Sequence, residues 1–269
     1  MKAYKHKILV LSDLENTLES TLKSTVSFAK MIDADIEFFY VKQPTEVVGR
    51  ESQLSAMRSI NETYVSTNKK LQNLIDAITS AEDVNINYSY AIGNVKSEIK
   101  DRIKITNPDM VIIGKRKPKA LGFIGDRVTD FILKNYEGSV VMSSNDNLEE
   151  SNNEMALGFY SNSPDYSNLK FVNELLKHTK RPIVAFKSYA AHAADKTENE
   201  NENKMGAIEY TFDNDKKVLD NLKAYLKRSR VNLLCLDRLE NSKTIASITN
   251  LLDKIDVSLM VTTVKPLNQ

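Results

Sequence analysis

The chain of 269 residues has few of the residues that form disulfides, coordinate metals or act in catalysis. It contains one cysteine, three histidines and no tryptophan. A single cysteine excludes an intrachain disulfide, and Cys235 lies within an apolar run, "VNLLCLD", that predicts a buried strand. The histidines His6, His178 and His192 are too scattered for a metal site. We therefore expect neither a disulfide framework nor a metal.

Long apolar runs and a charge surplus are also missing. No window approaches the length of a membrane-spanning helix, and the apolar stretch before Asp13 is too short for a signal peptide. The formal net charge is +1, which gives no global basic surplus for nucleic acid or an anionic membrane. The sequence thus predicts a cytoplasmic protein that binds neither nucleic acid nor membrane.

Common catalytic motifs are absent as well. The sequence has no G-x-S-x-G nucleophile turn, no Walker A loop and no S-x-x-K. Neither H-x-G-H nor S-G-G-x-D-S, which related folds use for adenylyl transfer, occurs. We expect the protein not to be an enzyme.

The first half alternates strands with helices. Apolar and alternating runs predict strands, and apolar residues at spacings of three and four predict helices between them. The expected strands are 6–13, 34–41, 84–92, 109–114 and 138–144, and the expected helices are 15–32, 50–80, 94–106 and 125–135. This alternation predicts a parallel sheet with helices on both faces.

A polar, acidic segment over 145–154 separates this half from a shorter version of the same order. The second half is predicted to have strands at 154–161, 181–189, 205–212, 231–237 and 256–263, with helices at 164–179, 214–229 and 242–254. A low-complexity stretch, 190–204, stands where the first half has its long second helix. We predict two doubly wound five-stranded domains in tandem, 1–147 and 154–269.

The first half resembles the universal stress protein family. The resemblance is carried by "KILVLSDLENTLESTLKSTVSFAK", by "AIGNVKSEIKDRIKITNPDMVIIGKR" and by "GDRVTDFILKNYEGSVVMSS", while the second half is similar only in element order. The family has a flavodoxin-like or Rossmann-like sheet of the HUP type. Some members bind ATP at the carboxyl ends of the strands, the edge where open α/β sheets bind ligands.

The resemblance implies a phosphate loop at "IIGKRKPKALGFIGDRV", residues 112–128. The family's pattern is a glycine, two residues, a second glycine, nine residues, a third glycine and then Ser or Thr. Gly114 matches the first glycine, but Lys117 replaces the second, and Gly125 comes two residues early. Asp126 then stands in the place of the hydroxyl residue, where a carboxylate can cap a helix but repels a triphosphate.

Two alternatives stay open for this loop. Its cations, Lys115, Arg116, Lys117 and Lys119, could neutralise an anion without a glycine cradle, or they could form a charged surface loop that contacts another protein. On the adenine side the resemblance implies Asp13 and Val41, although Asp13 also suits a helix cap and Val41 a core position. The second half has no glycine pattern, so we expect no nucleotide there.

The leading hypothesis is a non-catalytic stress-response regulator with a degenerate nucleotide site and no cofactor. The alternative is an ATP-binding member of the family that uses the basic loop for the phosphates. The two halves are expected to pair as a pseudo-dimer through residues 140–142 and 259–261, whose strands would otherwise lie at open sheet edges. A homodimer of the tandem chain and an unidentified protein partner are also expected.

Overall fold

The structure, a computed structural model, describes most of the chain. The described residues are 5–12, 18–44, 53–82, 84–114, 125–144, 155–160, 169–179, 182–188, 207–212, 218–238, 248, 251 and 254–262. The predicted linker 145–154, the stretch 190–204 and most of the predicted helix 242–254 lie outside these residues. Among the described helices, none has the length and apolarity needed to cross a lipid bilayer.

The first half has the predicted order of elements. Its strands are β1 (His6–Leu11), β2 (Ala34–Lys42), β3 (Ile86–Ile92), β4 (Met110–Gly114) and β5 (Ser139–Ser143). Its helices are α1 (Leu18–Ile32), α2 (Gln53–Glu82), α3 (Val95–Thr106) and α4 (Gly125–Asn135). The five strands are mutually parallel in the order β3-β2-β1-β4-β5, which confirms the doubly wound prediction.

The second half repeats this arrangement in shortened form. Its strands are β6 (Leu157–Tyr160), β7 (Val184–Ser188), β8 (Ile208–Phe212), β9 (Leu233–Asp237) and β10 (Ser258–Thr262). They are parallel in the order β10-β9-β6-β7-β8. Its described helices are α5 (Val172–Leu176) and α7 (Val218–Arg228).

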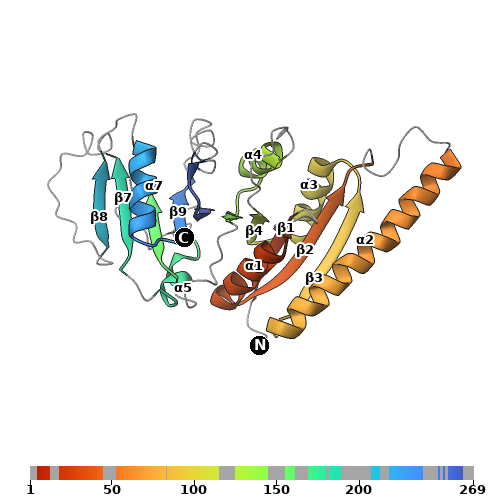
Figure 1. Cartoon of the computed structure of the whole chain (residues 1–269), viewed down its shortest axis with the longest axis horizontal. Coiled ribbons are helices and arrows are strands. Elements are labelled where there is room, and N and C mark those ends of the chain that lie inside the picture. Colours follow the sequence, from red (N-terminus) through yellow and green to blue (C-terminus); the bar gives the residue numbers. More distant parts are fainter. Residues whose placement is uncertain are drawn as a thin grey trace, which may run out of the picture.

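The two halves share one continuous sheet. Strands β5 and β10 pair antiparallel, with Met142 opposite Leu259, Val141 opposite Met260 and Val140 opposite Val261, and they join ten strands into a single sheet. These are the two segments that the sequence predicts to meet. Because the pairing is antiparallel, the carboxyl end of β5 lies beside the amino end of β10, and the twisted sheet carries the outer strands of the two halves to opposite sides of the molecule (Figure 1).

Helices cover both faces of the sheet. One buried cluster gathers side chains of α1, α2 and α5 with residues of both halves, and a second gathers side chains of α3, α4 and α7. The strands between them, such as β4 with Val111 and Ile112, are fully buried, as expected for parallel strands with covered faces. Both hydrophobic cores therefore run across the joint between the halves.

One predicted helix is wrong in extent. The apolar spacing predicts a helix over 164–179, but within residues 169–179 the structure has only the short α5. Phe171, directly before α5, adopts a left-handed backbone with φ of 68°. Its ring is buried and packs edge-on against His6 at 4.9 Å. Burial against the first half thus outweighs the local helical preference.

Candidate functional site

The candidate ligand edge of the first half lies where the strand order reverses. Strands β2 and β3 lie on one side of β1, and β4 and β5 lie on the other. In an open α/β sheet such a reversal leaves a crevice beyond the carboxyl ends of the two central strands. Leu11 pairs with Ile113 at the ends of β1 and β4, so Ser12 and Gly114 come next on neighbouring strands at this point.

Ser12 carries a polar atom that the fold leaves unsatisfied. Its Oγ is buried and has no hydrogen-bond partner within the described part of the chain. A buried hydroxyl without a partner is costly unless a water or ligand satisfies it. Sequence reasoning did not select Ser12, although a hydroxyl directly after a buried strand at this edge is a usable signal. The hydroxyl can donate to or accept from a bound group.

Helix α4 presents its amino terminus to the same edge. It begins at Gly125, so Asp126 falls in its first turn. A carboxylate in the first turn complements the partial positive charge of the helix end. The same charge is what would attract a phosphate. The sequence thus puts an acidic residue, and not the family's Ser or Thr, in the first turn of α4.

Of the other predicted site residues, the structure describes Val41 and Gly114 but not Asp13, Arg116 or Lys117. Val41 lies in β2, opposite Ala91, and is a partly buried member of the core beneath α3 and α4. Its packing fits the core position that the sequence offered as an alternative, and its contact with adenine stays a prediction. Asp13, Arg116 and Lys117 lie outside the described residues, as do the neighbouring cations of the loop. Gly114 lies at the end of β4, opposite Ser143.

The corner after β3 shows a second close fit at this edge. The N–H of Gly93 donates to the carbonyl of Lys42 at 3.0 Å. Asn94 caps α3 by accepting the N–H of Ser97 at 3.2 Å. A Cβ on Gly93 would collide with the Glu98 carboxylate.

At the carboxyl edge of the strands in the second half, a described side chain contacts the first half. Arg238 follows β9, and its N–H donates to the carbonyl of Thr262 at 2.8 Å. Its guanidinium Nη1 donates to the carbonyl of Tyr136, just after α4. Burial lowers the pKa of Arg238 and raises the pKa of Asp237 beside it. The described residues at this edge therefore serve contact between the halves.

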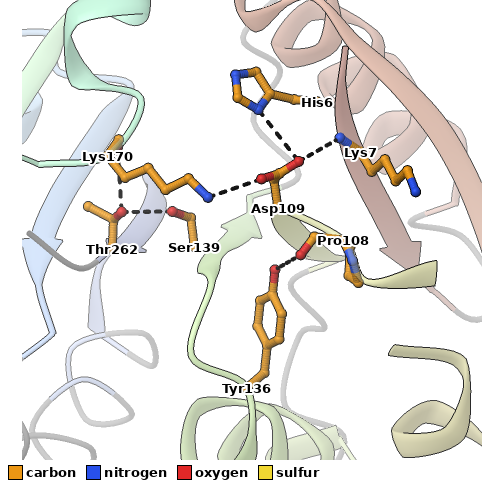
Figure 2. A network of polar contacts seen from close by, with 8 residues as sticks. All are labelled: His6, Lys7, Pro108, Asp109, Tyr136, Ser139, Lys170 and Thr262. Carbon is orange, nitrogen blue, oxygen red and sulfur yellow. Dashed lines mark hydrogen bonds and ion pairs between the residues drawn. The ribbon is translucent and has the colours of Figure 1, made fainter. Parts of the chain in front are cut away.

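A polar network that the sequence did not predict joins the halves at the amino ends of β1 and β4 (Figure 2). The Asp109 carboxylate accepts the backbone N–H of Lys7 and the Lys170 ammonium, each at 3.1 Å. His6 Nδ1 lies 3.5 Å from the same carboxylate. Lys170 comes from the second half, so a carboxylate of the first half holds a cation of the second.

Hydroxyl groups extend this network to the joint between the sheets. The Oγ of Ser139 and the Oγ1 of Thr262 lie 2.7 Å apart, and both residues are buried. Thr262 also donates to the carbonyl of Lys170 at 3.4 Å. Figure 2 shows this chain of contacts running from β10 to the turn before β4. These contacts hold the register of the paired strands β5 and β10 at one end of the pair.

Electrostatics favour the charged form of Asp109. Burial alone would raise the pKa of its carboxyl, but the Lys7 N–H and the Lys170 ammonium outweigh burial and lower that pKa below its usual value. Nearby, the Tyr136 hydroxyl donates to the carbonyl of Pro108 at 2.8 Å. Burial, together with the Asp109 charge, raises the pKa of Tyr136. The tyrosine thus stays neutral and acts as a structural donor.

The described residues offer no metal site. No group of three or more histidine, cysteine or acidic side chains is placed to hold a metal ion in the part of the chain that the structure describes. Cys235 is fully buried in β9, and burial raises the pKa of its thiol. The prediction of a core cysteine is confirmed.

These features define the fold class as tandem doubly wound α/β proteins, with the strand order of the first half reversing between β1 and β4. A family model described as the universal stress protein family matches residues 5–143. That match spans half of the chain, so the protein belongs to the universal stress protein family. No curated protein sequence matches the chain.

Solved structures with the same overall fold cover nearly the whole chain. A universal stress protein from Archaeoglobus fulgidus matches with a TM-score of 0.69 at 14% identity, covering 97% of each chain. A functionally unknown protein from Pseudomonas aeruginosa matches with a TM-score of 0.61 at 10% identity, covering 97% of this chain and 93% of that one. A putative universal stress protein from Pseudomonas aeruginosa gives 0.57 at 10% identity, with 97% and 94% covered. At these identities the likeness establishes the fold.

Proposed function

We propose that the protein is a non-catalytic regulator of the stress response that acts through protein partners and does not bind ATP tightly. Family membership supports the stress-response role. The expectation that ATP does not bind tightly rests on the sequence of the first turn of α4 and of the loop before it. Asp126 belongs to the first turn of α4, where the family has a hydroxyl residue and where a phosphate would bind, and Lys117 replaces a glycine of the family's loop.

A specific observation favours a second candidate function, an ATP-binding sensor. The buried Oγ of Ser12 lacks a partner among the described residues, and it lies at the edge where this fold class binds ligands. A bound nucleotide would satisfy it. The loop cations, including Arg116 and Lys117, would then neutralise the phosphates in place of the glycines.

Calorimetric titration of the full chain with Mg-ATP separates the two functions. The wild type is expected to give no saturable heat at micromolar ATP and no phosphate release. The variant Lys117→Gly/Asp126→Ser restores a glycine and a hydroxyl of the family's pattern, so it should gain affinity. The matched control Lys223→Ala/Asp256→Ser removes the same charges from an exposed ion pair of the second half and should not.

Micromolar binding of ATP by the wild type would contradict the leading proposal. If Arg116→Ala and Lys117→Ala then weakened binding while Lys223→Ala did not, the sensor function would be supported. Metal-dependent phosphate release would contradict the non-catalytic role, and its loss in Asp126→Asn would assign the reaction to this edge.

A further inference from the structure

Helix α2 is much longer than the strand that it covers. It runs from Gln53 to Glu82, 30 residues or about 45 Å, whereas β3 has seven residues and spans about 23 Å. Figure 1 shows its amino-terminal turns continuing past the carboxyl end of β3. Tyr64 lies near the point of departure, since its ring lies 4.5 Å from the ring of Tyr90 in β3.

The protruding part of α2 carries an apolar stripe. Leu54, Met57 and Val65 expose 76%, 68% and 68% of their surface, and Tyr64 exposes 52%. Spacings of three, seven and eight residues place them on one side of a helix. Only two other large apolar residues are comparably exposed within the described part of the chain, Ile105 and Ile208, and they lie on other elements. Such a concentration of exposed apolar residues marks an interaction surface.

The charges beside the stripe are self-complementary. Arg58 and Glu62 lie one turn apart along its border, both are exposed, and neither forms an ion pair with another described residue. If two α2 helices cross antiparallel near residue 60, Arg58 of each helix faces Glu62 of the other. A two-fold axis thus produces the same favourable contact twice.

Among the described residues, the edges of the sheet offer no comparable site for a second copy. Strands β5 and β10 pair with each other in the interior of the sheet, so their edges are already used within the chain. Of the two strands left at the ends of the sheet, β8 carries the exposed charge of Glu209, which opposes edge pairing, and β3 lies beside α2. The protruding helix is the surface that combines apolar area with matched charge.

We propose that residues 53–65 of α2 pair antiparallel with the same segment of a second copy and form a two-fold homodimer. The apolar stripe lies at the centre of this interface, and Arg58 and Glu62 form its polar border. The interface lies on α2, separate from the joint between the halves. It requires no nucleotide, so it is independent of the proposed function.

Light scattering coupled to size exclusion tests the dimer on the full chain. The wild type is expected to elute with the mass of two chains. Leu54→Glu/Val65→Glu places unpaired charges at the centre of the interface and should raise the dissociation constant about tenfold or more. Ile105→Glu, at an equally exposed apolar site on α3, is the matched control and should leave the dimer intact.

A charge exchange tests the register. Arg58→Glu alone and Glu62→Arg alone each place like charges opposite one another, so each should dissociate more readily than the wild type. A mixture of the two variants restores opposite charges and should form a heterodimer. A monomeric wild type would overturn the proposal, and so would a dimer unaffected by Leu54→Glu/Val65→Glu. A mixture no more stable than its components would overturn the antiparallel register.

Discussion

At the scale of single residues, Asp109 links the two halves of the fold, a role that its position just before a strand does not indicate. Its carboxylate lies where the chain enters β4, and it holds a backbone N–H of β1 and the Lys170 ammonium of the other half. Only 15% of the side chain is exposed. Ion pairs of this kind contribute more than exposed pairs, because solvent screens them less.

We expect Asp109→Asn to lower the free energy of unfolding by about 1–2 kcal/mol at neutral pH. The pKa of Asp109 is lower in the folded chain than in the unfolded chain, so its stabilisation is complete above the unfolded value and is lost as pH falls through the folded value. The difference between variant and wild type should therefore shrink below about pH 4. Urea unfolding across pH 3–7 measures it.

The exposed pair Lys223–Asp256 provides the control. Its side chains are 53% and 71% exposed, so Asp256→Asn should change stability by no more than about 0.5 kcal/mol at any pH in this range. Equal effects of the two substitutions would contradict a specific role for Asp109.

At the scale of elements, the β5–β10 pair holds the molecule together. It is the one antiparallel contact in an otherwise parallel set of described strand pairs, and its paired side chains are buried. Met260 is 0% exposed and belongs to a cluster that contains residues of both halves. The joint is thus packed like the interior of a single domain.

Truncating Met260 should therefore be costly. We expect Met260→Ala to lower the free energy of unfolding by about 2–5 kcal/mol, because it removes buried contacts and leaves a cavity at the joint. Chemical denaturation measures the loss. Ile105→Ala, at a site that is 74% exposed, should stay within about 0.5 kcal/mol of the wild type. Comparable losses would show that the joint contributes no special stability.

At the scale of the whole molecule, both core clusters draw on both halves. The first runs from Ile8 to Met260 and the second from Leu9 to Val261. Neither half can lose its packing without exposing apolar surface of the other. The chain thus resembles one folding unit built from two repeats.

Calorimetry should accordingly show a single unfolding transition, with a calorimetric enthalpy close to the van't Hoff value. Two resolved transitions in the wild type would contradict the shared core. Met260→Asp, which buries a charge at the joint, should broaden or split the transition.

Several features followed from the sequence because they depend on local pattern. Apolar periodicity predicted the five strands of each half. The family resemblance and the expected position of the closing strands at sheet edges predicted the contact between 140–142 and 259–261. The helix over 164–179 was wrong in the described residues, because burial of Phe171 against His6 decides its backbone. Asp109 was missed for a related reason, since its contacts involve Lys7 and Lys170, which are distant in the chain.

The sequence by itself thus determined the class of fold, the repeat and the family, since each is written in period, order and motif. The tertiary structure decided which residues far apart in the chain meet and which surfaces stay exposed. It placed Lys170 against Asp109 and left the first turns of α2 beyond the sheet. Such contacts join residues far apart in the chain, and no local pattern specifies them until the sheet is assembled.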